Sequence, residues 1–142
     1  MGVEVNVSAV VLADQDDRVL LVRKRGTEGW MNPGGKPEPG ESPVACAVRE
    51  VSEELGIVLD PGKLQPLGRL SALAANEPGQ TVVADVFVWP EALRVTPAVA
   101  AEIAASRWVT PADLDDPKLA PLFVEQIVPR LTGRWLGLRS CR

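Results

Sequence analysis

The chain has 142 residues, of which 46% are hydrophobic, so its length and composition fit one domain with its own core. It carries 15 basic and 19 acidic residues, and this net charge of −4 argues against a protein that binds the phosphate backbone of a nucleic-acid polymer. A small phosphorylated ligand remains compatible with this charge, because one or two cations and a metal ion can hold it. We therefore expect a single domain over residues 1–142 with a small-molecule partner.

Cysteine and histidine are scarce: the chain contains only Cys46 and Cys141 and no histidine. A disulfide framework and a Cys/His zinc site are therefore excluded, as are Ser-His and Cys-His nucleophile pairs. If the chain is an enzyme, carboxylates and a hard metal ion remain as the chemical groups. Neither a secretion signal nor a run of roughly 20 apolar residues is found, so we expect a cytoplasmic location and no membrane partner.

Two strands are predicted at the start of the chain. Valines and alanine alternate with polar residues over 3–11, which is typical of a half-buried strand. Residues 14–17 form a polar turn, and 18–25, with an apolar centre, predict a second strand paired to the first. Residues 26–41 are rich in glycine and proline and predict a loop.

A helix follows this loop and has clear end signals. Ser42 is a suitable N-cap, Pro43 suits the first helical position, and Gly56 provides the C-terminal stop. An apolar stripe recurs at helical spacing and predicts the face that packs on the sheet: Val44, Val48, Val51 and Leu55.

The second half of the chain alternates between strand and helix signals. Residues 64–74 and 81–89 predict strands, 107–109 a short strand, and 119–131 a closing helix whose last turn Pro129 disturbs. Over 98–105 the alanines favour helix, whereas the preceding proline and the following β-like residues favour a loop or strand, so both interpretations stay open.

Three glutamates of the predicted helix lie at positions i, i+3 and i+4: Glu50, Glu53 and Glu54. On a helix these carboxylates gather on one face, which we expect to lie opposite the apolar stripe. Like charges at this spacing repel by a few tenths of a kcal/mol per pair, roughly. Either Arg49, four residues before Glu53, or a divalent cation with oxygen ligands could offset that repulsion.

Residues just before the helix add backbone flexibility and a further acid. Glycine at positions 34 and 35 permits a close approach of the backbone to a metal ion or phosphate. Glu41 lies where a carboxylate can brace the loop through its amides, at the helix end that favours negative charge.

Residues 35–57 resemble the Nudix box, which reads Gly, five residues, Glu, seven residues, then Arg-Glu-apolar-any-Glu-Glu-any-Gly-apolar. Every defined position is matched: Gly35, Glu41, Arg49, Glu50, Val51, Glu53, Glu54, Gly56 and Ile57. The flanking order of strands and a final helix is also similar. The resemblance, closest to the MutT-like members, implies an α/β fold, the Nudix α/β/α sandwich, with a mixed β-sheet between helices and a loop–helix–loop catalytic segment.

The resemblance also implies roles for the residues of the box. Glu50, Glu53 and Glu54 would bind Mg²⁺, with Mn²⁺ as the alternative ion, and one of them would deprotonate the attacking water. The Gly35 carbonyl would be a further metal ligand, while Arg49 and Glu41 would orient the carboxylates. Glu102, in a segment similar to the family's downstream acid, is a further candidate ligand, with an exposed surface charge as the open alternative.

Substrate choice follows by elimination among members of the family. The proline typical of ADP-ribose enzymes is replaced by Ala72 and Leu73, and the tyrosine typical of dinucleoside polyphosphate enzymes by Ala75. The MutT-type group remains, which cleaves a nucleoside triphosphate such as dGTP or its oxidised form into monophosphate and pyrophosphate. An ADP-ribose or nucleotide-sugar pyrophosphatase and a non-catalytic nucleotide-binding regulator stay open, and a homodimer is compatible with the family.

Residues around the box are candidates for binding the substrate. Trp30 and Asn32 could stack on and hydrogen-bond a base, although a core-capping tryptophan and a loop-bracing asparagine are the alternatives. Three cations could reach the phosphates: Arg23, Arg25 and Lys36.

Overall fold

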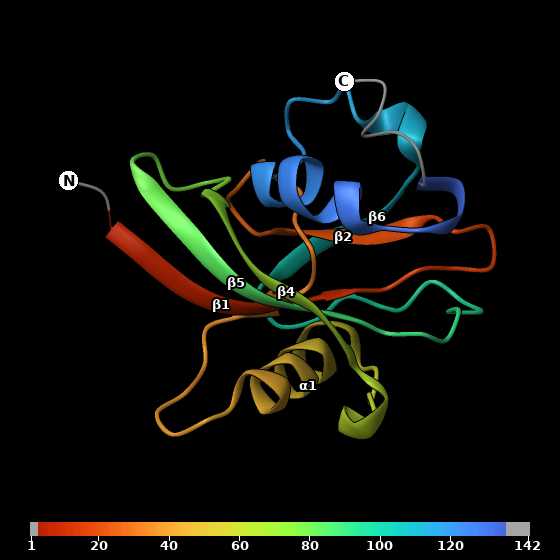
Figure 1. The fold of residues 1–142 in the computed structure, drawn as a ribbon, viewed down its shortest axis with the longest axis horizontal. Coiled ribbons are helices and arrows are strands. Elements are labelled where there is room, and N and C mark those ends of the chain that lie inside the picture. The colour runs from red at the N-terminus through yellow and green to blue at the C-terminus, as the bar shows by residue number, and fades with distance from the viewer. Residues whose placement is uncertain (1–2, 136–142) are drawn as a thin grey trace.

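A mixed four-stranded sheet forms the centre of the protein, whose computed structural model describes residues 3–135 (Figure 1). In the order β3-β1-β5-β4, β1 pairs parallel to β5, and the other neighbours are antiparallel. The strands are β1 (Val3–Val11), β3 (Gly34–Gly35), β4 (Gln65–Leu73) and β5 (Gln80–Val88). The long strands therefore confirm the sequence predictions to within one residue at most ends, and β3 is an addition inside the predicted loop.

A second, two-stranded sheet pairs β2 (Val19–Lys24) with β6 (Ile103–Val109). The prediction that the second strand pairs along the first holds only beside the turn, where the Leu20 N–H donates to the Leu12 carbonyl at 2.9 Å. Farther along β1, β5 occupies one edge and residues 33–35 the other, so the β2 ladder forms with β6 instead. Strand β6 begins at Ile103, four residues before the predicted strand, which settles the end of the ambiguous 98–105 segment as strand.

Helix α1 (Pro43–Leu55) begins and ends where its sequence signals predict. The Ser42 hydroxyl accepts a hydrogen bond from the Ala45 N–H at 3.2 Å, which satisfies one free donor of the first turn. At the other end Gly56 has φ 68°, a left-handed conformation in which glycine carries no steric penalty. These local caps fix the helix independently of its packing.

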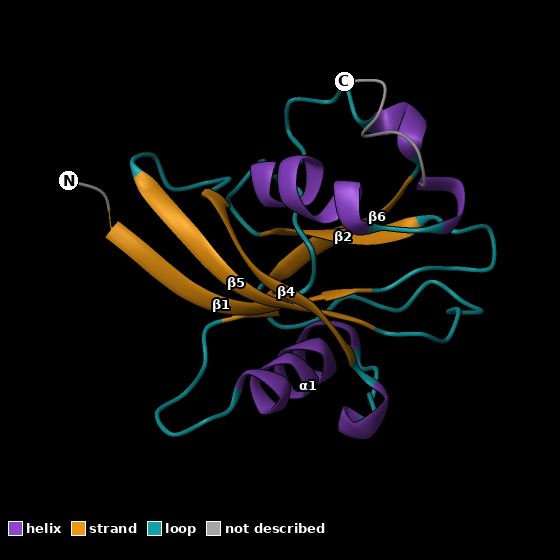
Figure 2. Ribbon diagram, viewed as in Figure 1, coloured by secondary structure: helices purple, strands orange, loops and turns teal. Residues whose placement is uncertain are grey.

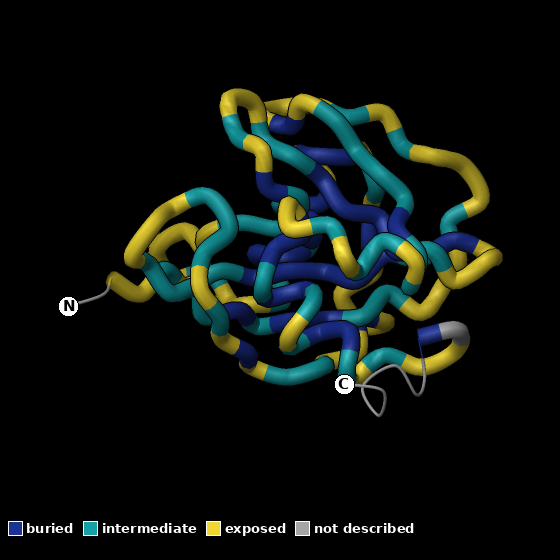
Figure 3. Tube along the Cα trace, turned by 90° about the horizontal axis from the view of Figure 1, so that it is seen from above, coloured by how far each residue is buried: buried dark blue, intermediate teal, exposed yellow. Residues whose placement is uncertain are grey.

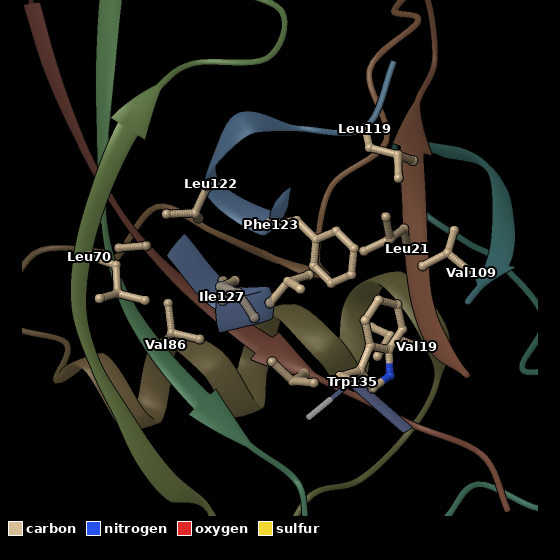
Figure 4. Close-up of a cluster of buried hydrophobic side chains, with 14 residues drawn as sticks. Val19, Leu21, Leu70, Val86, Val109, Leu119, Leu122, Phe123, Ile127 and Trp135 are labelled. Atoms are coloured by element: carbon tan, nitrogen blue, oxygen red, sulfur yellow. The ribbon is translucent and has the colours of Figure 1, made fainter. Parts of the chain in front are cut away.

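The helices cover both faces of the sheet, as Figures 1 and 2 show, with α1 on one side and the closing helical segment on the other. Each interface has its own cluster of buried apolar side chains, one including Val51 and Leu55 of α1 and the other Phe123 and Ile127. In the latter cluster the Phe123 and Trp135 rings meet edge to face at 5.7 Å (Figure 4). The predicted α/β/α sandwich with a mixed sheet is confirmed.

The closing segment is helical where predicted, but its geometry is not that of a regular α-helix. A π-helix over Leu122–Ile127 passes directly into a 3₁₀ turn over Val128–Arg130. Pro129, which has no N–H to donate, lies in that turn, in agreement with the predicted disturbance.

Burial follows the strand centres, while the connecting loops are largely exposed (Figure 3). In the range 3–135 none of the helices has both the length and the apolar character that a membrane span requires. Cys46 is buried, and Cys141 lies outside the described residues.

Candidate metal and phosphate site

Arg49 of α1 forms a network of ion pairs that connects the helix to the preceding loop. Its Nε and Nη2 donate to the two carboxylate oxygens of Glu41 at 2.8 and 2.9 Å. Its Nη1 donates to Glu50 at 3.2 Å and to Glu53 at 3.1 Å. These bonds from Arg49, together with the Glu38 N–H, lower the pKa of Glu41 to about 2, and the Arg49 pKa is raised in turn. Arg49 and Glu41 thus lie beside Glu50 and Glu53, the carboxylates that the resemblance predicts they orient.

The three glutamates of α1 do not share one exposed face, which corrects the sequence prediction. The Glu53 side chain is 52% exposed and the Glu50 side chain 14%, whereas residue Glu54 is 1% exposed. Strand β3 packs against α1 here, with the Gly34 N–H donating to Glu54 Oε1 at 3.2 Å, and from the segment before β6 the Ala100 N–H donates to the Glu54 carbonyl at 2.9 Å. Helical periodicity could not reveal this burial, because it depends on segments distant in the sequence that pack against the helix.

Glu54 is a buried carboxyl whose second oxygen, Oε2, has no hydrogen-bond partner in the described part of the chain. Burial raises the pKa of Glu54 to about 8, against the lowering effect of the Gly34 N–H, and the charge of Glu50 raises it further. Burial also raises the pKa of Glu50. A cation beside these two groups would pair the free oxygen and stabilise both charged forms, so the donor set fits a divalent metal ion.

Glycine at position 35 lets the loop approach α1 closely. A Cβ atom there would overlap the Glu50 carboxylate, the flexible end of a side chain, so a larger residue would turn that acid away from its present position, whereas a Cβ at position 34 would overlap the Ser8 backbone carbonyl. The Gly35 carbonyl accepts a bond from the Cys46 Sγ at 3.3 Å, which fixes the carbonyl beside the helix. The role of this carbonyl as a metal ligand stays a prediction.

Glu102 reaches the same region from the segment before β6. Its side chain is 64% exposed, lies 3.6 Å from Lys24 Nζ, and is close enough to raise the pKa of Glu54. Even so, within residues 3–135 no three Asp, Glu, Cys or His side chains are gathered tightly enough to hold a metal ion by themselves. Glu50 and Glu54 are the two more buried acids of this region, while Glu53 and Glu102 are more exposed.

A cleft of about 480 Å³ opens beside these carboxylates. Two of the predicted substrate-binding residues, Asn32 and Lys36, line it, together with Gly35, Glu50 and Glu102. Lys24 lines it as well and was missed from the sequence. The alternation of β2 was the available signal, since it places Lys24 on the face opposite its two arginine neighbours.

Trp30 and two predicted phosphate ligands lie elsewhere. Trp30 is not part of the cleft wall: it packs against the core cluster that contains Phe123, and the guanidinium groups of Arg23 and Arg107 lie over its ring, 5.6 and 5.7 Å from the centroid. Arg23 also donates to the Thr27 carbonyl at 2.9 Å. Arg25 is exposed and likewise absent from the cleft wall. None of the three lines the cleft, although the Arg25 N–H donates to the Glu102 carbonyl at 2.9 Å, and their role in substrate binding stays a prediction.

Comparison with known proteins places the chain in a family. A family model described as NUDIX domain matches residues 3–131. Diphosphoinositol polyphosphate phosphohydrolase 2 of Mus musculus is 46% identical over 66 residues, which cover 46% of this chain and 34% of that protein. A putative 8-oxo-dGTP diphosphatase of Bacillus subtilis (strain 168) is 40% identical over 47 residues, covering 33% of this chain and 32% of that protein. The matched region thus spans about a third of the curated relatives' length.

Solved structures agree with the family over a larger share of the chain. A MutT NUDIX hydrolase from Burkholderia pseudomallei superposes with a TM-score of 0.61 and 28% identity, covering 80% of this chain and 85% of that one. The family model spans nearly all of the described residues and therefore includes both the sheet and the acidic loop–helix segment. The chain belongs to the NUDIX family and has the Nudix fold.

Proposed function

We propose that the protein is a Mg²⁺-dependent pyrophosphohydrolase that cleaves a nucleoside triphosphate, of the dGTP or oxidised dGTP type, into a monophosphate and pyrophosphate. The observation that carries the proposal is the buried carboxyl of Glu54, with an unpaired oxygen, beside Glu50 and the Gly34–Gly35 backbone at the edge of the cleft. A buried acid without a cationic partner is unfavourable, and a divalent ion with its phosphate ligand supplies that partner.

Glu50, Glu54 and the Gly35 carbonyl would hold the ion, with Glu53 and Glu102 as outer ligands. When bound, such an ion neutralises charge on the phosphate oxygens and lowers the pKa of water; manganese could take its place. Lys24 and Lys36 line the cleft and would bind the triphosphate oxygens. Arg49 keeps the carboxylates of Glu41, Glu50 and Glu53 in position.

Hydrolysis then requires one proton acceptor for the attacking water. Glu53 is half exposed and is held by Arg49 Nη1, so we assign it as the group that takes this proton. The water oxygen forms a bond to phosphorus as the bridging P–O bond breaks, and pyrophosphate leaves. The 40% identity to the putative 8-oxo-dGTP diphosphatase over 47 residues supports a triphosphate substrate.

Product analysis with purified protein tests the proposal. With Mg²⁺ and a panel of nucleoside triphosphates, we expect monophosphate and pyrophosphate in equal amounts, and the Glu53→Gln variant should lose at least about 10²-fold in turnover with its fold intact. Cleavage of ADP-ribose or a nucleotide sugar, with the triphosphates left intact, would instead establish the diphosphatase alternative. Binding without turnover of any of these compounds would establish a non-catalytic regulator.

A further inference from the structure

The side-chain amide of Asn32 has no hydrogen-bond partner among residues 3–135. Asn32 is 7% exposed and lines the cleft, and both its Nδ2 and Oδ1 atoms are buried without a hydrogen bond. Buried amides are nearly always paired, since an unpaired donor or acceptor is destabilising. Two unpaired atoms on one side chain, at a cleft wall, indicate that the partner comes from the ligand.

The walls of the cleft near the sheet are aliphatic. The apolar side chains come from β1, β4, β5 and the closing helix: Val5, Val7, Leu73, Val82 and Leu122. Among the described residues, no aromatic side chain lines this cleft, because Trp30 lies outside it. Such walls accept a flat, neutral ring but provide no aromatic stacking. Recognition of that ring must therefore depend on hydrogen bonds.

The charge of the cleft limits how many phosphates the ligand can carry. Its lining contains two cations, Lys24 and Lys36, against Glu50, Glu77 and Glu102 in the part of the chain that the structure describes. A polyol bearing phosphates around its ring would meet more acids than bases and would have few polar partners along the aliphatic walls. A ligand with one polyphosphate chain and one uncharged ring matches this distribution.

We propose that Asn32 is a specificity-determining residue that binds the base of the nucleotide with both amide atoms. The matching edge presents one donor beside one acceptor, as the ring N–H and carbonyl of guanine do, with Nδ2 donating and Oδ1 accepting. Since the amide has almost no contact with solvent, the base must displace neighbouring side chains to reach it. The inference rests on the proposed nucleotide substrate and names the residue that recognises its base.

The test measures binding and stability separately, without turnover. Asn32→Leu keeps the approximate size of the side chain and removes both polar atoms. Asn6→Leu is the control, because Asn6 is exposed and its Oδ1 already accepts from Arg69. Titration calorimetry with Mg²⁺ compares α,β-methylene-GTP, which carries the base, with inorganic triphosphate, which does not.

We expect Asn32→Leu to bind the nucleotide analogue about tenfold more weakly while its affinity for inorganic triphosphate is unchanged. Its Tm should stay equal or rise, because the substitution breaks no hydrogen bond within the protein. Asn6→Leu should bind both ligands as the wild type does. If Asn32→Leu does not fold, Asn32→Ala is measured in the same way.

Two results would overturn the inference. One is unchanged nucleotide binding by the folded variant; the other is an equal loss for both ligands together with a lower Tm, which would show that Asn32 braces the loop. Failure of the proposed function is seen separately, as absence of pyrophosphate release by the wild type. A wild type that hydrolyses triphosphates but has the same affinity for both ligands would refute only the role of Asn32.

Discussion

Replacing Glu54 by glutamine tests the origin of the unusual carboxyl in the site. The substitution keeps the size of the side chain and an oxygen that can accept from the Gly34 N–H, but it removes the titrating proton. The folded wild type retains that proton up to the Glu54 pKa of about 8, whereas the unfolded chain releases it near the ordinary value of 4.5. Between these values the folded state binds one more proton, so raising the pH lowers the free energy of unfolding.

The size of this effect follows from the two pKa values. Each pH unit between them lowers the stability of the metal-free wild type by up to about 1.4 kcal/mol. Over the whole window the loss approaches about 5 kcal/mol as an upper bound, and it levels off above pH 8. Glu54 is 1% exposed, so solvent screening does little to reduce it. Glu54→Gln should lack this component and become more stable than the wild type at pH 8.

Urea denaturation of both proteins in EDTA from pH 5 to 9 measures the difference directly. A second readout is Mg²⁺ titration calorimetry at pH 7 in two buffers of different ionisation enthalpy. The wild type should release close to one proton on binding, and Glu54→Gln should bind more weakly and release none from this site. Parallel stability curves for the two proteins across this pH range would refute a buried, protonated Glu54.

Two further substitutions test the contacts around this acid. Gly35→Ala introduces a Cβ that overlaps the Glu50 carboxylate, so we expect Mg²⁺ affinity and turnover to fall at least about tenfold. Calorimetry measures the Mg²⁺ affinity, and pyrophosphate release measures the turnover. A variant with the Mg²⁺ affinity of the wild type would contradict the close packing of the Gly35 backbone against Glu50. Arg49→Lys keeps the charge but loses the two-point contact with Glu41, so turnover should fall about tenfold and the Glu41 pKa should rise from about 2 towards 4.5. Carboxyl NMR titration measures the Glu41 pKa in both proteins. An unchanged pKa in Arg49→Lys would show that the positive charge alone, without the two-point contact, lowers the Glu41 pKa.

The sequence determined the features that depend on neighbouring residues. The ends of α1 follow from Ser42, Pro43 and Gly56, because capping and left-handed termination involve only contacts along the chain. The motif of residues 35–57 also lies within one contiguous segment, so the family and its acidic helix could be predicted without a structure. The strand positions followed from alternation for the same reason.

Only the tertiary structure decided which of these residues meet. Strand β2 pairs along β6, whose partner residues are 79 to 90 positions away, because both edges of β1 are occupied over most of its length. Three further features depend on such long-range contacts. Glu54 is buried beside β3, Lys24 lines the cleft, and Trp30 does not line it. Periodicity reports the direction of a side chain from its own element, but the element packed against it determines whether that side chain reaches solvent, a ligand or the core.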